Sequence, residues 1–153
     1  MGLDQWLFKK TYVKKWDDTP IDKQYHVVVT RGGEPCPNIN SDKVSHIQED
    51  VAYWRKANQI HHWFVKNIQN GEDDCREYPV SKEDLQALLE VCQCVKNEPI
   101  DANMLLPVSD GFFYGSQEFD QYYFDQIDHT IEVLEEILAN YDQDADYYYQ
   151  ASW

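Results

Sequence analysis

The sequence predicts an α+β fold in which a small, mainly antiparallel sheet packs with three helices. Short runs rich in aromatic and β-branched residues occur toward both ends of the chain, as is typical of strands. Between them, capping patterns precede stretches with the spacing of amphipathic helices. The 153 residues contain no internal repeat and no linker long enough to divide them, so one domain, residues 1–153, is expected.

An N-terminal hairpin is the first predicted element. Residues 3–13 alternate loosely between apolar and polar side chains, and residues 25–30 are similarly rich in strand-forming types. Residues 17–22, which contain Pro20, are expected to form the turn between these strands. Residues 31–44 follow as a loop interrupted by glycines and prolines.

The first helix is predicted from Ser45 to about Asn70. Ser45 and Gln48 match a capping box at its start, an amphipathic pattern follows, and Gly71 ends it. Residues 76–80 then have the composition of a short central strand.

Two further helices and a final strand complete the predicted fold. Ser81 and Asp84 form a second capping-box pattern before a helix that is expected to end near Lys96. A third helix is predicted over residues 116–141, with Ser116 as its N-cap. A C-terminal strand is predicted over residues 147–153.

The chain is strongly acidic, with a formal net charge of −15 that is unevenly distributed. Residues 101–153 contain twelve Asp or Glu and no Lys or Arg. Such a field repels nucleic acid within a Debye length of about 8–10 Å and attracts basic surfaces. We therefore expect no direct binding of nucleic acid, and a basic host protein, either nucleic-acid-binding or a defence effector, as partner.

Membrane attachment is not expected. No run approaches the roughly 20 apolar residues of a membrane span, and the N-terminus lacks the apolar core of a signal peptide. The expected location is the cytoplasm of a host cell.

Metal binding by the cysteines is a minor alternative. The four cysteines are Cys36, Cys75, Cys92 and Cys94. They lack the spacing of a metal knuckle and are expected to be free thiols in a reducing cytoplasm. A zinc site that joins Cys75 to His61 or His62 is the other interpretation. No cofactor and no metal is predicted.

Polar residues fall on the apolar face of the first predicted helix. Asn58 and His61 lie within the apolar arc, and burying their groups is costly unless they are hydrogen-bonded. They either form a core network or help to line a pocket for an anionic or nucleotide-like ligand. The predicted ligand-binding residues are Arg55, Asn58, His61, His62, Tyr114 and Asp120.

Asp120 also has two interpretations. It falls on the inward stripe of the third predicted helix, in the first turn, where the helix dipole favours a carboxylate. If it instead orients His61, the pair offers a general base for a small hydrolase-type enzyme. No residue is assigned as catalytic, because neither a nucleophile nor a metal accompanies the pair.

The outward face of the third predicted helix carries an acidic ridge, which consists of Asp125, Asp128, Glu132, Glu135 and Glu136. These residues share an arc of about 100°, and neighbours three or four apart are spaced by about 5–6 Å, comparable to phosphates along a nucleic-acid strand. The ridge is either an ordinary solvated helix face or a nucleic-acid mimic that occupies a basic groove. Trp63, predicted to project from the polar side of the first helix, is assigned to the same partner-binding surface.

Several motifs resemble those of a group of small phage and prophage proteins. The motifs are Met1-Gly2-Leu3-Asp4, Ala52-Tyr53-Trp54-Arg55-Lys56-Ala57-Asn58, Ile60-His61 with Trp63-Phe64, Gly71-Glu72-Asp73-Asp74-Cys75, Gly111-Phe112-Phe113 with Gly115-Ser116, and Tyr147-Tyr148-Tyr149-Gln150 with Ser152-Trp153. The resemblance spans nearly the whole chain, and Gln5-Trp6 departs from it where an aliphatic residue or Tyr is expected. It implies a phage setting and carries over no catalytic residue.

Three functions remain after the sequence has been considered. The leading hypothesis is a phage-encoded accessory protein that binds and inhibits a host nucleic-acid-handling or defence protein, in the manner of an anti-CRISPR protein. The acidic ridge favours it. The alternatives are a binder or sponge for a small nucleotide-like ligand, and an enzyme that uses His61 and Asp120.

Overall fold

The computed structural model describes residues 2–111 and 114–153, which form an α+β fold. Its strands are β1 (Asp4–Tyr12), β2 (Thr30–Arg31), β3 (Glu34–Pro35), β4 (His46–Arg55), β5 (Tyr78–Val80) and β6 (Ala145–Ser152). Its α-helices are α1 (Asn58–Asn67), α2 (Lys82–Asn97), α3 (Ala102–Leu105) and α4 (Gln121–Ala139). Four strands form an antiparallel sheet in the order β4-β1-β6-β5, and β2 pairs with β3 in a separate hairpin.

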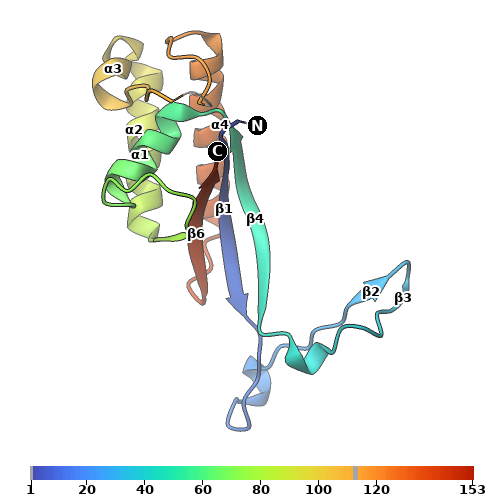
Figure 1. Cartoon of the computed structure of the whole chain (residues 1–153). Helices are drawn as coiled ribbons and strands as arrows, with labels where there is room; N and C mark the ends of the chain where they lie inside the picture. Colours follow the sequence, from blue (N-terminus) through green and yellow to red (C-terminus); the bar gives the residue numbers. More distant parts are fainter. Residues whose placement is uncertain (1, 112–113) are drawn as a thin grey trace.

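One face of the sheet is buried against the helices. Along β6, alternate residues from Ala145 to Ala151 are buried, and the residues between them are more exposed, as the two-residue period of a strand requires. The long helices lie together on one side of the sheet, and both chain ends lie near the same end of the strands (Figure 1). Within the described part of the chain, no helix is both long and apolar enough to cross a membrane.

The predicted N-terminal hairpin is wrong. The strand expected at residues 3–13 is confirmed as β1, but β1 pairs with β4 on one side and β6 on the other. Residues 25–29 form no strand, and Tyr25 and Val28 remain 47% and 70% exposed. A strand is stabilised by what its side chains pack against, and residues 25–29 have no core surface to cover.

The helix predicted from Ser45 to Asn70 is in fact a strand followed by a shorter helix. Residues 46–55 form β4, so Ser45 and Gln48 cap no helix, and α1 covers only Asn58–Asn67. Pairing with β1 overrides the local helical pattern. Lys56, whose φ of 54° lies in the left-handed region, turns the chain between the two elements.

The later elements agree better with expectation. The helix that follows Ser81 is confirmed as α2, and the C-terminal strand is confirmed as β6. β5 spans only three residues and lies at the edge of the sheet, not at its centre. The third predicted helix begins at Gln121 because Asp120, not Ser116, is its N-cap. The short helix α3 adds to the three long ones, and Phe112 and Phe113 lie outside the described residues.

Residues 14–45 form an arm that projects away from the sheet between β1 and β4 (Figure 1). The arm carries the β2–β3 hairpin, and most of its residues are exposed, including Trp16 at 58% and Ile21 at 88%. Its five Lys or Arg balance its five Asp or Glu. The net charge of −15 therefore belongs entirely to the remainder of the chain.

The capping box of α2 makes a testable contribution to stability. The Ser81 hydroxyl accepts a hydrogen bond from the Asp84 N–H at 3.1 Å, and the Asp84 carboxylate accepts one from the Ser81 N–H at 2.9 Å. We expect Ser81→Ala to lower the free energy of unfolding by about 1 kcal/mol, measured by urea denaturation. Ser41→Ala, in an exposed turn of the arm, is the control and should change it by less than about 0.5 kcal/mol. Equal losses from both substitutions would contradict a capping role.

Candidate functional site

All five members of the acidic ridge lie on the exposed side of α4. Asp125, Asp128, Glu132, Glu135 and Glu136 are each exposed, as predicted from the helical projection. One ion pair was not foreseen, because Lys96 of α2 lies 2.8 Å from a carboxylate oxygen of Asp128. Within residues 2–111 and 114–153, Asp128 is the one ridge residue in an ion pair. The other four carboxylates of the ridge form no ion pair within the described residues, although Lys96 also attracts Glu135.

The exposed half of β4 extends this acidic surface. Glu49, Asp50 and Glu136 line a cavity of about 350 Å³ between β4 and α4. Lys9 of β1 reaches the same cavity and lies 3.6 Å from Glu49 and 3.4 Å from Asp142. Desolvation would lower the pKa of Lys9, but Glu49 and Asp142 outweigh it and raise that pKa. Glu49 and Asp50 were not predicted as part of the acidic surface because residues 46–55 were expected to be helical.

Trp63 does not belong to the exposed surface, which corrects the prediction. Its side chain is 8% exposed and packs edge-to-face on Phe64, with ring centroids 5.3 Å apart. The helical projection of the sequence assumed that one side of this helix is exposed to solvent. α1 is instead enclosed, so that six of its first seven residues are buried.

His61 is the centre of a buried hydrogen-bond network. Its ring is 1% exposed, and its Nδ1 lies 2.8 Å from the Tyr149 hydroxyl. The same hydroxyl lies 3.1 Å from Oε1 of Gln5, and Nε2 of Gln5 donates to the Ala57 carbonyl at 3.2 Å. The network therefore connects β1, α1 and β6.

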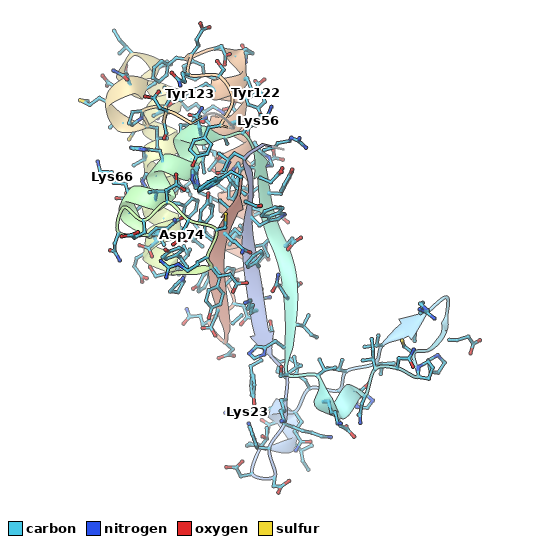
Figure 2. All side chains as sticks on the ribbon, viewed as in Figure 1. Lys23, Lys56, Lys66, Asp74, Tyr122 and Tyr123 are labelled. Carbon is cyan, nitrogen blue, oxygen red and sulfur yellow. The ribbon has the colours of Figure 1, made fainter. Side chains whose placement is uncertain are left out.

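Asp73 holds the other nitrogen of His61. Nε2 of His61 lies 2.9 Å from Oδ1 of Asp73, and the same carboxylate accepts hydrogen bonds from the Tyr114 hydroxyl at 2.5 Å and from the Trp153 indole at 3.2 Å. Burial and the bond to Asp73 both raise the pKa of Tyr114, so this phenol remains a donor. The neighbouring Asp74, labelled in Figure 2, fixes the loop by accepting hydrogen bonds from Arg76.

This geometry supports a structural role for His61. Both ring nitrogens are engaged, and the ring has almost no contact with solvent, so no nitrogen is free to take a proton from a substrate. Asp120 is not its partner. The Asp120 carboxylate accepts a hydrogen bond from the Tyr123 N–H at 3.0 Å at the start of α4. This geometry agrees with the first interpretation of Asp120, a carboxylate that stabilises the N-terminus of a helix.

The remaining predicted ligand residues are dispersed. Asn58 is buried, where its Nδ2 donates to the carbonyls of Tyr114 and Ser116 at 3.3 and 2.7 Å. Arg55 lies exposed at the end of β4, and its carbonyl accepts a hydrogen bond from the Tyr122 hydroxyl. His62 is half-buried and lines a different groove, between α1 and α2. The structure thus joins Asn58, His61 and Tyr114 in the core and leaves Arg55, His62 and Asp120 outside it.

The structure describes all four cysteines as free. Cys92 is buried, and burial raises the pKa of its thiol to about 12. Cys75 and Cys94 are exposed, and Cys36 is partly exposed. Among residues 2–111 and 114–153, no three His, Cys, Asp or Glu side chains are grouped as metal ligands.

The buried imidazole predicts how stability depends on pH. Burial lowers the pKa of His61, and the nearby Asp73 carboxylate opposes this shift without reversing it. Because the unfolded chain then binds a proton at higher pH than the folded protein, acidification favours unfolding. We expect this contribution to the free energy of unfolding to be lost as the pH falls below about 6.5, the pKa of an unperturbed histidine.

The test compares the wild-type protein with His61→Gln by urea denaturation across this pH range. The variant should be less stable at neutral pH, and the difference should shrink on acidification, because glutamine does not titrate. Titration of the carboxylates remote from His61 affects both proteins alike and cancels in the difference. A difference that stays constant with pH would contradict a neutral, buried His61.

Comparison of the chain with protein-family models, with curated proteins and with solved structures finds no match.

Proposed function

We propose that this protein acts by binding, and that the acidic ridge of α4 occupies a basic groove on a partner that handles nucleic acid. The observation that carries the proposal is the ridge itself, because its five exposed carboxylates share one arc of α4. Adjacent acidic residues of β4, Glu49 and Asp50, widen the same surface. The resemblance to phage proteins suggests the setting, in which the partner is a host nucleic-acid-handling or defence protein such as a CRISPR effector.

Charge and rigidity both support the ridge as a docking surface. Four of its carboxylates have no cation within ion-pair distance in the described part of the chain, so a basic groove would gain attraction without breaking existing pairs. α4 is anchored by Ile127 and Leu134, which are 1% and 0% exposed. A preformed helix loses little conformational entropy on binding, which favours affinity.

The two alternatives have less support. An enzyme would require an accessible reactive group, whereas the two nitrogens of His61 are engaged in the core. A nucleotide-like ligand would require Arg55, Asn58 and His61 to converge, whereas Asn58 and His61 bond to protein groups and Arg55 lies apart. Binding through the exposed acidic surface is therefore the function that the geometry supports best.

The experiment that tests this proposal is comparative capture from a host-cell lysate. Three immobilised proteins are used: wild type, a ridge variant with Asp125→Lys, Glu132→Lys and Glu136→Lys, and a control variant with Glu72→Lys, Glu90→Lys and Glu118→Lys. The six substituted residues are all exposed, and both variants change the net charge equally. We expect wild type and control to retain the same basic nucleic-acid-binding protein and the ridge variant to lose it. Equal retention by both variants would contradict the proposal.

A further inference from the structure

A groove among the helices combines an apolar lining with neutral and basic polar residues. It has a volume of about 240 Å³ and lies between α1, α2 and the segment that follows α3. Its apolar lining comes from Trp63, Val91, Met104, Leu105, Leu106 and Pro107. Trp63 and Leu106 are 8% and 1% exposed, so they form a floor that belongs to the core.

The polar residues of the groove are all neutral or basic. His62 and Lys66 lie one helical turn apart on α1, and Asn67 follows. Nδ2 of Asn67 donates to the Trp63 carbonyl at 2.8 Å, which fixes the end of α1. Lys66 is exposed at the outer edge of α1 (Figure 2). Among the described residues that line this groove there is no Asp or Glu, although Asp and Glu outnumber Lys and Arg by 28 to 13 in the chain.

We propose that this groove binds a small amphipathic carboxylate, whose apolar body lies against Val91, Met104 and Leu105 above the Trp63 ring and whose head is held by Lys66 and His62. An apolar groove with one cationic edge selects for a ligand with an apolar body and an anionic head. The volume of about 240 Å³ is below the roughly 300–1,000 Å³ of pockets for drug-sized ligands, so a short apolar chain fits it. That is the body of a straight-chain carboxylate such as octanoate, with its head at the mouth.

This site is independent of the acidic ridge and goes beyond the proposed function. It also differs from the pocket expected from sequence. Of the six residues predicted for that pocket, His62 is the one that lines the groove. Reversing charges on α4 therefore leaves the groove intact, and changing Lys66 leaves the ridge intact. Failure of one proposal does not entail failure of the other.

Titration calorimetry with octanoate tests the site, and 1-octanol serves as a probe of the same length without the charge. The variants are Lys66→Gln and a matched control, Lys23→Gln, which removes a lysine of the arm far from the groove (Figure 2). We expect octanoate to bind with a Kd of about 0.1–1 mM and Lys66→Gln to weaken it about fivefold. Lys23→Gln should change nothing, and octanol should bind wild type and Lys66→Gln alike.

A second variant keeps the test informative. Met104→Glu places a carboxylate at the rim, where the side chain is 75% exposed and tolerates substitution, and it should also weaken octanoate but not octanol. The absence of saturable octanoate binding to wild type at about 10 mM would overturn the proposal. Equal effects of Lys66→Gln and Lys23→Gln, or octanol that binds as tightly as octanoate, would overturn it as well.

Discussion

Replacing Tyr149 by Phe is expected to lower the free energy of unfolding by about 1–3 kcal/mol. The substitution keeps the ring, which stacks on Phe64 with centroids 3.8 Å apart, and removes only the hydroxyl. That hydroxyl lies within 3.1 Å of both Nδ1 of His61 and Oε1 of Gln5. All three side chains are at most 1% exposed, so water cannot replace the lost group.

Tyr148→Phe is the matched control for this prediction. Tyr148 is the preceding residue of β6, it is only half-buried, and its ring faces the Lys10 ammonium, a contact that Phe preserves. Removing the Tyr148 hydroxyl should change the free energy of unfolding by less than about 0.5 kcal/mol. Urea denaturation at pH 7.5 measures both variants. If Tyr149→Phe were as mild as the control, the buried network would not contribute to stability as described.

The ridge variant, with Asp125, Glu132 and Glu136 changed to Lys, is expected to bind the captured partner about 100-fold more weakly than wild type. Each reversal loses an attraction of about 0.2–1 kcal/mol and introduces a repulsion of similar size, so three reversals together cost about 1–6 kcal/mol, a range that includes the roughly 2.8 kcal/mol of a 100-fold change. Titration calorimetry on the purified partner measures the change. The affinity of wild type should also fall as salt is raised, because exposed charges are screened.

The control variant, with Glu72, Glu90 and Glu118 changed to Lys, isolates the ridge from net charge. It should retain the affinity of wild type within about threefold, since long-range attraction is weaker than contact between charges. Circular dichroism should show that both variants remain folded, because the substituted residues are exposed. If the two variants lost affinity equally, total charge rather than the ridge would explain binding.

Elements with strong local signals could be predicted from the sequence. The capping box at Ser81 and the apolar stripe behind it predict α2, and both are confirmed. The aromatic residues of the tail at 147–153 predict β6, and the ridge depends only on helical periodicity within α4. In each case the residues that specify the element are neighbours in sequence.

Features that depend on distant contacts could not be predicted. Residues 46–55 fit a helical pattern, yet they pair with β1, and local pattern contains no information about that pairing. Asp73 was missed as the partner of His61 for a similar reason. Asn70 and Gly71, with φ of 53° and 83°, reverse the chain after α1 and bring Asp73 back to the ring. The acidic residues that follow Gly71 were the signal in the sequence for a carboxylate partner of His61.

The most direct test of the central claim asks whether the partner can hold this protein and nucleic acid at the same time. Fluorescence anisotropy follows a labelled duplex bound to the purified partner while the protein is added. If the acidic ridge occupies the groove that binds nucleic acid, wild type displaces the duplex and the ridge variant does not. A stable complex that contains partner, duplex and wild-type protein together would contradict the account.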